Sequence, residues 1–417
     1  MEDKYTPDVI CNVVGVCTAE SGQTCSLFPT PKSSKMLNGL MNKAEFEQHV
    51  AEAKGKYGAS FKGLKFNACD WFPAACRIGD HKPVFDEDGD LFSNYGPLRG
   101  SDWRGQDCDD THNGIFPGRH DLDIAADNNC NGIFGVDPAT NLPYEKQWCE
   151  GTNSMGVAIL GDSATAHFRI PPAYLTASKL SAHTFSNFIR NLENELDFPM
   201  LSWSTGHRRT EEFAPDVDGP VDSIYMRMRK NNLCNHNDYQ NIGVNGASSG
   251  NLMGFSSILS RDNLISALPQ KPVLLYMAMI GNDVCTHSAN PRNTPEKYKQ
   301  YFKDTILSLE NRLPKGSKII TVGLVDGRIL FESMHNRVHP LGSTNQDVTF
   351  GNFYDYLNCL DLSPCSGWMN SNETIRDATS ATAAAMRNTL PEVIAETKDQ
   401  LKNIEVHYLG DLIDDAI

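Results

Sequence analysis

The sequence lacks any long hydrophobic run, and this absence excludes one class of protein. No apolar stretch reaches the ~18 residues that a membrane-spanning helix needs, so we expect no transmembrane segment. Positive charge is scarce as well, because 52 acidic residues outnumber 37 lysines and arginines and give a formal net charge of −15. Such a chain is poorly suited to bind nucleic acid or an anionic membrane through charge.

The sequence also lacks the closely spaced cysteine pairs that are typical of zinc sites. Its twelve cysteines are spread along the chain without any Cys-x2-Cys pair. Disulfides account better for so many cysteines, which predicts a secreted protein or one of lysosomal or endosomal vesicles. Cys359 and Cys365 bracket five residues and could close a small loop, and Asn372 begins a glycosylation sequon.

Lysine is absent between Asp86 and Asp137, where twelve acidic residues stand against three arginines. A solvated acidic loop is one interpretation, because blocks of like charge repel one another. The regular spacing of oxygen-bearing side chains, with Gly132 after the last set, favours calcium loops, since calcium prefers carboxylate and amide oxygens. No glutamate stands at a loop end, so the ligand set stays open, and Asp137 is a candidate to close it. The predicted calcium ligands are Asp86, Asp88, Asp90, Asp107, Asp109, Asp110, Asp123, Asp127, Asn129 and Asn131.

Three apolar stretches end in short polar loops that carry residue types used in ester hydrolysis. The stretches and their loop residues are Val157–Leu160 before Ser163, Tyr239–Val244 before Gly246, and Val273–Ile280 before Asn282. Buried parallel strands form continuous apolar runs, and ligand sites of open α/β sheets gather at their carboxyl ends. Ser163 is therefore a candidate nucleophile, although a turn in which Ser163 only caps a helix is the alternative. A glycine permits close approach of the backbone, and an asparagine amide can donate to an oxyanion.

The remaining pattern predicts an α/β fold for residues 151–417. Further strands are expected at Ser317–Val325 and Ile404–Leu409, and helices at Phe302–Leu313 and Ala378–Ala395. Strands that alternate with helices favour a three-layer α/β/α sandwich around a parallel sheet. Before it we expect a linking segment over 26–80, with a helix at Met41–Tyr57 and Cys69 and Cys76 tying it down, and the acidic calcium-binding segment over 81–150.

The three strand-end loops resemble a known set of sequence blocks. Gly161-Asp-Ser163, Asn245-Gly-Ala-Ser248 and Gly281-Asn-Asp283 occur in the order of the first three blocks of the SGNH (GDSL-like) hydrolases. The resemblance implies that Ser163 is the nucleophile. It also implies that the Ser163 amide, Gly246 and Asn282 form the oxyanion hole.

A longer similarity connects the chain with the acyloxyacyl hydrolase family, which removes secondary fatty acyl chains from the lipid A of bacterial lipopolysaccharide. The stretches that carry it are Arg99–Cys108, Asn129–Pro138, Pro143–Lys146, Cys234–Asn241, Ile280–Cys285 and His335–Gly342. The similarity runs from about Pro7 to near Asp411, implies bound calcium in the acidic segment, and departs at Thr165, where a glycine is expected. The alternatives are a general phospholipase or acetyl esterase of the same class, or a calcium-stabilised lipid-binding protein without catalysis.

The two ends of the chain depart from this resemblance. SGNH enzymes carry their general base on a late Asp-x-x-His block, and none follows Ile404–Leu409. His339 is the nearest mimic, with Asn336 in place of the aspartate, whereas His167, His287 and His335 are expected to be structural or surface residues. Cys11 and Cys17 resemble the closing cysteines of a saposin-like domain, with residues 1–25 as its remnant, or else pair locally or with Cys25. We therefore expect a chain truncated at both ends, whose full-length form carries a saposin-like region upstream.

Overall fold

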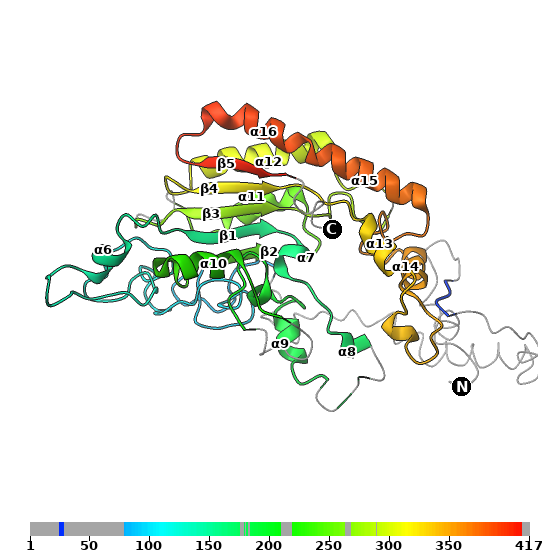
Figure 1. Ribbon diagram of the computed structural model, residues 1–417, viewed down its shortest axis with the longest axis horizontal. Coiled ribbons are helices and arrows are strands. Elements are labelled where there is room, and N and C mark those ends of the chain that lie inside the picture. The colour runs from blue at the N-terminus through cyan, green and yellow to red at the C-terminus, as the bar shows by residue number, and fades with distance from the viewer. Residues whose placement is uncertain are drawn as a thin grey trace, which may run out of the picture.

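A five-stranded parallel sheet forms the centre of the computed structural model, which describes residues 25–28 and 79–410 except 176–178, 180, 182–183, 210–218, 263–267 and 289. The strand order is β2-β1-β3-β4-β5 (Figure 1). The strands are β1 Gly156–Gly161, β2 Tyr239–Gly243, β3 Val273–Ala278, β4 Lys318–Val322 and β5 Glu405–Leu409. All five predicted apolar stretches are thus strands, and the predicted parallel α/β architecture is confirmed.

The order of the strands places β1 at the point where the chain reverses its direction across the sheet. The chain passes from β1 to β2 on one side and then crosses to β3 on the other side. Loops that leave neighbouring strands in opposite directions open a crevice at the carboxyl edge, where ligands of doubly wound sheets bind. In Figure 1 the strand arrowheads point to this edge, and α7 (Ser163–Ala166) lies there at the end of β1.

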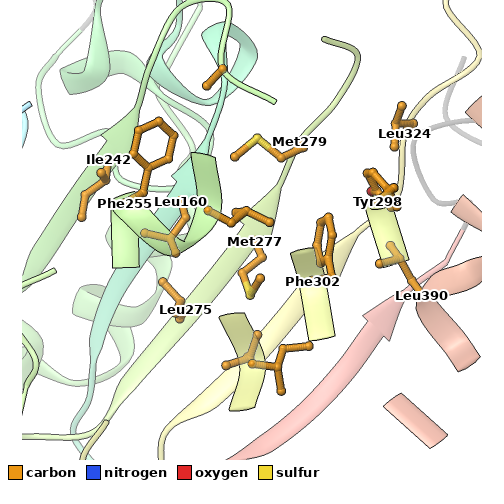
Figure 2. Packing of buried hydrophobic residues seen from close by; sticks show 14 of the residues in the cluster. Leu160, Ile242, Phe255, Leu275, Met277, Met279, Tyr298, Phe302, Leu324 and Leu390 are labelled. Atoms are coloured by element: carbon orange, nitrogen blue, oxygen red, sulfur yellow. The ribbon is translucent and has the colours of Figure 1, made fainter. Parts of the chain in front are cut away.

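One face of the sheet carries the main hydrophobic core. The helices that cover it are α11 Leu252–Ser257, α12 Pro295–Glu310, α15 Glu373–Arg387 and α16 Thr389–Thr397. Figure 2 shows Met277 of β3 beside Phe302 of α12, with Leu160, Phe255 and Leu390 in the same cluster. These side chains are almost completely buried, so the alternating inward residues of the strands hold the helices in place.

The predicted helix at Ala378–Ala395 is two helices in the structure. It breaks at Asn388, between α15 and α16. Pro391 lies in the first turn of α16 and has no backbone N–H to donate to the preceding turn. The predicted helix at Phe302–Leu313 is α12, which begins earlier because Thr294 accepts a hydrogen bond from the backbone N–H of Lys297 and Pro295 follows it.

The opposite face is covered at the β1 and β2 side by α10 (Ile224–Asn231), whose Tyr225 packs with Val157 and Tyr239. The other described α-helices are α6 Tyr144–Cys149, α8 Pro172–Leu175, α9 Phe188–Glu193, α13 Arg328–Met334 and α14 Phe350–Cys359. Short 3-10 helices are η2 Pro199–Leu201, η4 Leu233–Asn235, η5 Ser249–Asn251, η6 Pro340–Gly342 and η7 Lys398–Gln400. None of the described helices has the length and apolar character to cross a membrane.

The acidic segment lies along the outer edge of β2. The Gly105 N–H donates to the carbonyl of Tyr239 at 2.8 Å, and the Asn241 N–H donates to the carbonyl of Trp103 at 2.8 Å. These bonds satisfy backbone groups that an edge strand would otherwise expose. The segment is therefore packed against the sheet, and its Arg99 reaches the end of β2, where it donates to the Gly243 carbonyl.

Four disulfides lie within the described residues: Cys25–Cys359, Cys108–Cys130, Cys149–Cys234 and Cys285–Cys365. The predicted small loop between Cys359 and Cys365 is wrong. The Ser366 N–H donates to the carbonyl of Thr286 at 2.8 Å, which draws Cys365 to the loop after β3 and to Cys285. Since Cys25 pairs with Cys359, it is not a partner of Cys11 or Cys17. Those two, Cys69, Cys76 and Met41–Tyr57 lie outside the described residues.

Candidate active site

Ser163 is the first residue of α7 and follows β1 after a single residue, Asp162. The Asp162 side chain caps the helix by accepting the Ala164 N–H at 3.0 Å. The capping role that the alternative interpretation gave to Ser163 therefore belongs to Asp162. Ser163 is half-buried, and no described residue lies within hydrogen-bond distance of its hydroxyl, which leaves that oxygen available to a bound molecule.

Asp162 also joins the loop after β1 to the loop after β3. Its Oδ2 accepts the Ile280 N–H at 2.7 Å and the Gly281 N–H at 3.3 Å. The carboxyl group is 2 % exposed, and this burial raises its pKa to about 6, although the three backbone donors oppose the shift. Through these bonds Asp162 fixes the loop after β3 relative to Ser163, and with it Asn282, the residue after Gly281.

A second buried carboxylate, Asp283, joins the loop after β3 to the loop after β2. It accepts the Ser249 hydroxyl at 2.5 Å, the Ser249 N–H at 3.0 Å and the Asn293 amide at 2.6 Å. Burial raises its pKa, and these donors oppose the shift. Sequence reasoning did not assign a role to Asp283. The signal was its place beside Asn282 in a loop at a buried strand end.

Gly246 forms the tip of the loop after β2. Its φ of 75° lies in the left-handed region that favours glycine, and the turn is closed by the Ala247 N–H, which donates to Val244 at 3.1 Å. The Arg292 guanidinium donates to the Gly246 carbonyl at 2.7 Å. A Cβ built on Gly246 would meet no atom within 4 Å, so this side of the loop faces open space.

Three donors remain unused at the carboxyl edge of the sheet. Among the described residues, no acceptor lies within hydrogen-bond distance of the Ser163 N–H, the Gly246 N–H or the Asn282 side-chain amide. Backbone donors in folded proteins are nearly always paired with protein or water. Three unpaired donors on loops joined by Asp162 and Asp283 are groups of the kind that can donate to an oxyanion.

The departure at Thr165 has a local structural account. Thr165 is fully buried, and its hydroxyl donates to the Asp162 carbonyl at 2.7 Å. A Cβ at Gly161 would lie 2.3 Å from the Thr165 side chain, and one at Gly243 would lie 2.6 Å from it. The glycines that end β1 and β2 thus leave the space that the threonine fills.

The histidines near this edge serve local structure. His339 caps η6, since its Nδ1 accepts the Leu341 N–H at 3.2 Å, and its ring stacks on Phe353 at 4.1 Å between centroids. Burial lowers the pKa of His339 to about 4, which makes it a weak base at neutral pH. His167 and His335 occupy the C-caps of α7 and α13, and His287 is exposed.

The acidic segment brings five of the predicted calcium ligands into one cluster. Single oxygens of Asp86, Asp88 and Asp110 lie within 4.8 Å of one another, as do oxygens of Asp88, Asp90 and Asp107. One oxygen of each of Asp88, Asp90 and Asp107 is buried without a hydrogen-bond partner. Burial raises the pKa of Asp90 to about 8 and that of Asp107 to about 7.

Asp109 lies apart from that cluster. Its carboxylate accepts the Thr111 hydroxyl at 2.6 Å and pairs with His112 at 2.8 Å. Asp137 likewise serves its own turn, because it accepts the Ala139 N–H at 2.8 Å and the Thr140 hydroxyl at 3.1 Å.

The last predicted loop is built around Asp127. Its two oxygens accept the backbone N–H groups of Asn131 and Gly132 at 3.1 and 2.8 Å. The side-chain amides of Asn129 and Asn131 donate to Glu145 of α6 at 3.1 and 3.2 Å, and buried Lys271 lies 3.2 Å from the same carboxylate. Asp123 contributes another buried oxygen without a partner. Sequence reasoning gave Glu145 no role because it lies outside the loop, although it stands in Pro143–Lys146, one of the stretches that carry the family similarity.

Comparisons with known proteins identify the family of the chain. The model of the family GDSL-like Lipase/Acylhydrolase matches residues 157–409. The chain is 40% identical to the acyloxyacyl hydrolase of Homo sapiens over 409 residues, which are 96% of this chain and 69% of that protein. The identity and both coverages are the same for the enzyme of Oryctolagus cuniculus. The acyloxyacyl hydrolase of Mus musculus is 39% identical over 421 residues, with 98% of this chain and 70% of that protein covered.

Proposed function

The chain belongs to the acyloxyacyl hydrolases within the GDSL-like lipase/acylhydrolase family and is a lipid acylhydrolase of the serine ester hydrolase type, and from this premise we propose its substrate and its catalytic residues. The substrate is the lipid A part of bacterial lipopolysaccharide. The bond that is cleaved is the ester by which one fatty acyl chain is attached to the hydroxyl of another.

The observation that carries the catalytic assignment is the set of three unused donors on the loops that follow β1, β2 and β3, together with the unpaired hydroxyl of Ser163. Ser163 Oγ attacks the ester carbonyl carbon, and the carbonyl oxygen becomes an oxyanion. The N–H groups of Ser163 and Gly246 and the amide of Asn282 donate to that oxyanion. The proton of the Ser163 hydroxyl passes to the leaving alcohol as the ester C–O bond breaks, which leaves an acyl-enzyme. Water then cleaves the acyl-enzyme, releases the fatty acid and restores the serine hydroxyl.

Exposed aromatic side chains in the segment of chain that follows Ser163 support a substrate with long acyl chains. Phe168, which follows the C-cap residue of α7, is 45 % exposed, and Phe185 is 52 % exposed. Tyr174 and Phe188 pack against Phe185 at 5.1 and 5.9 Å between ring centroids. Exposed apolar groups of this extent are typical of surfaces that contact lipid or protein.

Hydrolysis products from three defined substrates test the substrate assignment. Purified protein is incubated with lipopolysaccharide, with a diacyl phospholipid and with an acetylated sugar, and the released acids are identified by mass spectrometry. We expect release from lipopolysaccharide, with the acyl chains bound directly to the sugar left in place. Preferential release from phospholipid or acetylated sugar would contradict the assignment. Binding of lipopolysaccharide without release would favour a lipid-binding protein instead.

Calcium is the proposed cofactor of the acidic segment. Buried oxygens of Asp88, Asp90, Asp107 and Asp123 have no hydrogen-bond partner, and a hard cation with six to eight oxygen ligands suits such a set. Asp86 and Asp110 complete one ligand group, with Asp88, Asp90 and Asp107. Asp127, Asn129 and Asn131 complete a second ligand group, with Asp123. Calcium bound there neutralises the carboxylates and holds the segment against β2. Metal analysis of purified protein is the test, and Asp88→Ala and Asp127→Ala should each lower the bound calcium.

Secretion or delivery to lysosomal or endosomal vesicles is the proposed localisation. The four disulfides within the described residues support it, because such bonds persist in oxidising compartments. Fractionation of producing cells and their medium tests this point, and recovery of reduced protein from the cytosol would contradict it.

A further inference from the structure

The connector Asn194–Phe198, between α9 and η2, has an unfavourable backbone conformation. Glu195 and Leu196 have φ values of 62° and 61°, and neither is a glycine. Left-handed backbone is unfavourable for residues with a side chain, so two in succession persist only where their surroundings fix them. Such conformations concentrate at functional sites.

One side of the connector contacts the chain that follows Ser163. The Arg169 N–H donates to the Leu196 carbonyl at 3.0 Å, and the Phe198 N–H donates to the His167 carbonyl at 3.1 Å. These bonds hold the two segments as a short antiparallel pair directly beyond α7. The connector is therefore fixed relative to Ser163.

The other side of the connector holds the loop that contains Gly246. The side-chain amide of Asn245 donates to Asp197 Oδ2 at 3.1 Å and to the Glu195 carbonyl at 3.2 Å. Asp197 is 1 % exposed, and its Oδ1 has no partner among the described residues. Burial raises the pKa of Asp197 to about 8, although Arg99 opposes the shift. An incompletely paired buried carboxyl group weakens a fold, so packing alone does not account for it.

Arg99, from the acidic segment, also binds the connector. Its guanidinium makes a paired contact with the Glu195 carboxylate at 2.6 and 2.7 Å and donates to the Gly243 carbonyl at 2.8 Å. Gly243 ends β2, three residues before Gly246. A buried arginine therefore fixes the connector to the end of β2, which leads into the loop that contains Gly246.

We infer that Asp197 is a positioning residue for ester hydrolysis, which through Asn245 sets the place of the Gly246 N–H relative to Ser163. This inference rests on the proposed roles of Ser163 and Gly246. Oxyanion donors act only within a narrow range of positions, so a loop that shifts by about 1 Å can lose about 100-fold in rate. The connector contacts both catalytic loops and can transmit such a shift.

The test separates turnover from folding. Asp197→Ala, Asp197→Asn and the control Asp222→Ala, an exposed carboxylate paired with Arg227, are compared on a p-nitrophenyl ester with active sites counted from the initial burst. Asp197→Ala should lower kcat per active site ~10–100-fold with KM changed less than about twofold. Asp197→Asn keeps an acceptor for Asn245 and should restore kcat to within about threefold, and Asp222→Ala should match the parent.

A merely structural role of Asp197 would lower the fraction of active protein and leave kcat per active site within about twofold of the parent, and that result overturns the inference. If Asp197→Ala does not fold, Asn245→Ala tests the same hydrogen bond from the loop side, with the same expected fall and the same contradicting result. If the proposed catalytic role of Ser163 is itself wrong, Ser163→Ala will retain turnover, and this result distinguishes that failure from a failure of the inference about Asp197.

Discussion

Replacing Asn282 by alanine separates transition-state binding from folding more cleanly than any other change at this edge. Its amide has no partner among the described residues, so the substitution leaves no buried group unpaired. We expect the free energy of unfolding to change by less than ~0.5 kcal/mol. Loss of one oxyanion donor should lower kcat ~10²–10³-fold, or about 3–4 kcal/mol of transition-state stabilisation, with KM nearly unchanged.

Asn293, eleven residues after Asn282, offers a matched control. Its amide donates to Asp283 at 2.6 Å in a buried setting, so Asn293→Ala removes a hydrogen bond to a charged group. That change should cost about 2 kcal/mol of stability and should lower kcat less than tenfold, because Ser249 still holds Asp283. Asn282→Ala is thus expected to lose turnover and keep its stability, whereas Asn293→Ala is expected to lose stability and keep most of its turnover.

The assay combines urea unfolding with turnover of a p-nitrophenyl ester and with the rate of labelling by a fluorophosphonate probe. Both rates should fall in Asn282→Ala, because negative charge develops on an oxygen that the amide is expected to contact in each reaction. That oxygen is bound to a tetrahedral carbon in ester hydrolysis and to a five-coordinate phosphorus in labelling. A kcat within about threefold of the parent would refute the oxyanion role of Asn282. A fall in kcat that accompanies an equal loss of stability would refute the reasoning from its unpaired amide.

Three further predictions follow from the buried carboxylates and from His339. Chelation should lower the melting temperature, and calcium should restore it better than magnesium; a melting curve indifferent to both would favour a solvated acidic loop. The raised pKa of Asp162, about 6, means that the folded protein binds this proton more tightly than the unfolded chain. Raising the pH from about 4 to about 6 should therefore weaken the parent by about 2 kcal/mol relative to Asp162→Asn. Equal pH dependence of both proteins in urea unfolding would contradict this. His339→Asn keeps a cap for η6 and should retain fluorophosphonate labelling, whereas a tenfold loss would make His339 the base.

The strands and the position of Ser163 could be predicted from the sequence because both depend on local pattern. Continuous apolar runs become buried parallel strands, and Ser163 follows the first of them. The boundary inside Ala378–Ala395 was also readable in principle, since Pro391 cannot donate to the preceding turn. Its effect was missed because the apolar spacing continues across it.

The contacts that hold the site together could not be predicted, because they join residues far apart in the chain. The Ile280 N–H that Asp162 accepts is 118 residues away, and Glu145 reaches Asn131 from a separate helix. Spacing alone likewise could not separate Asp109 from Asp107 and Asp110, since the turn at Thr111 decides which carboxylate faces the cluster. Cys365 pairs 80 residues away rather than with its neighbour in sequence.

The most direct test of the central claim is the fatty acid released from lipopolysaccharide by the parent protein and by Ser163→Ala, measured by mass spectrometry at equal amounts of folded protein. The parent should release acyl chains that are esterified to other acyl chains, and the variant should bind lipopolysaccharide but release none. Equal release by both proteins would contradict it.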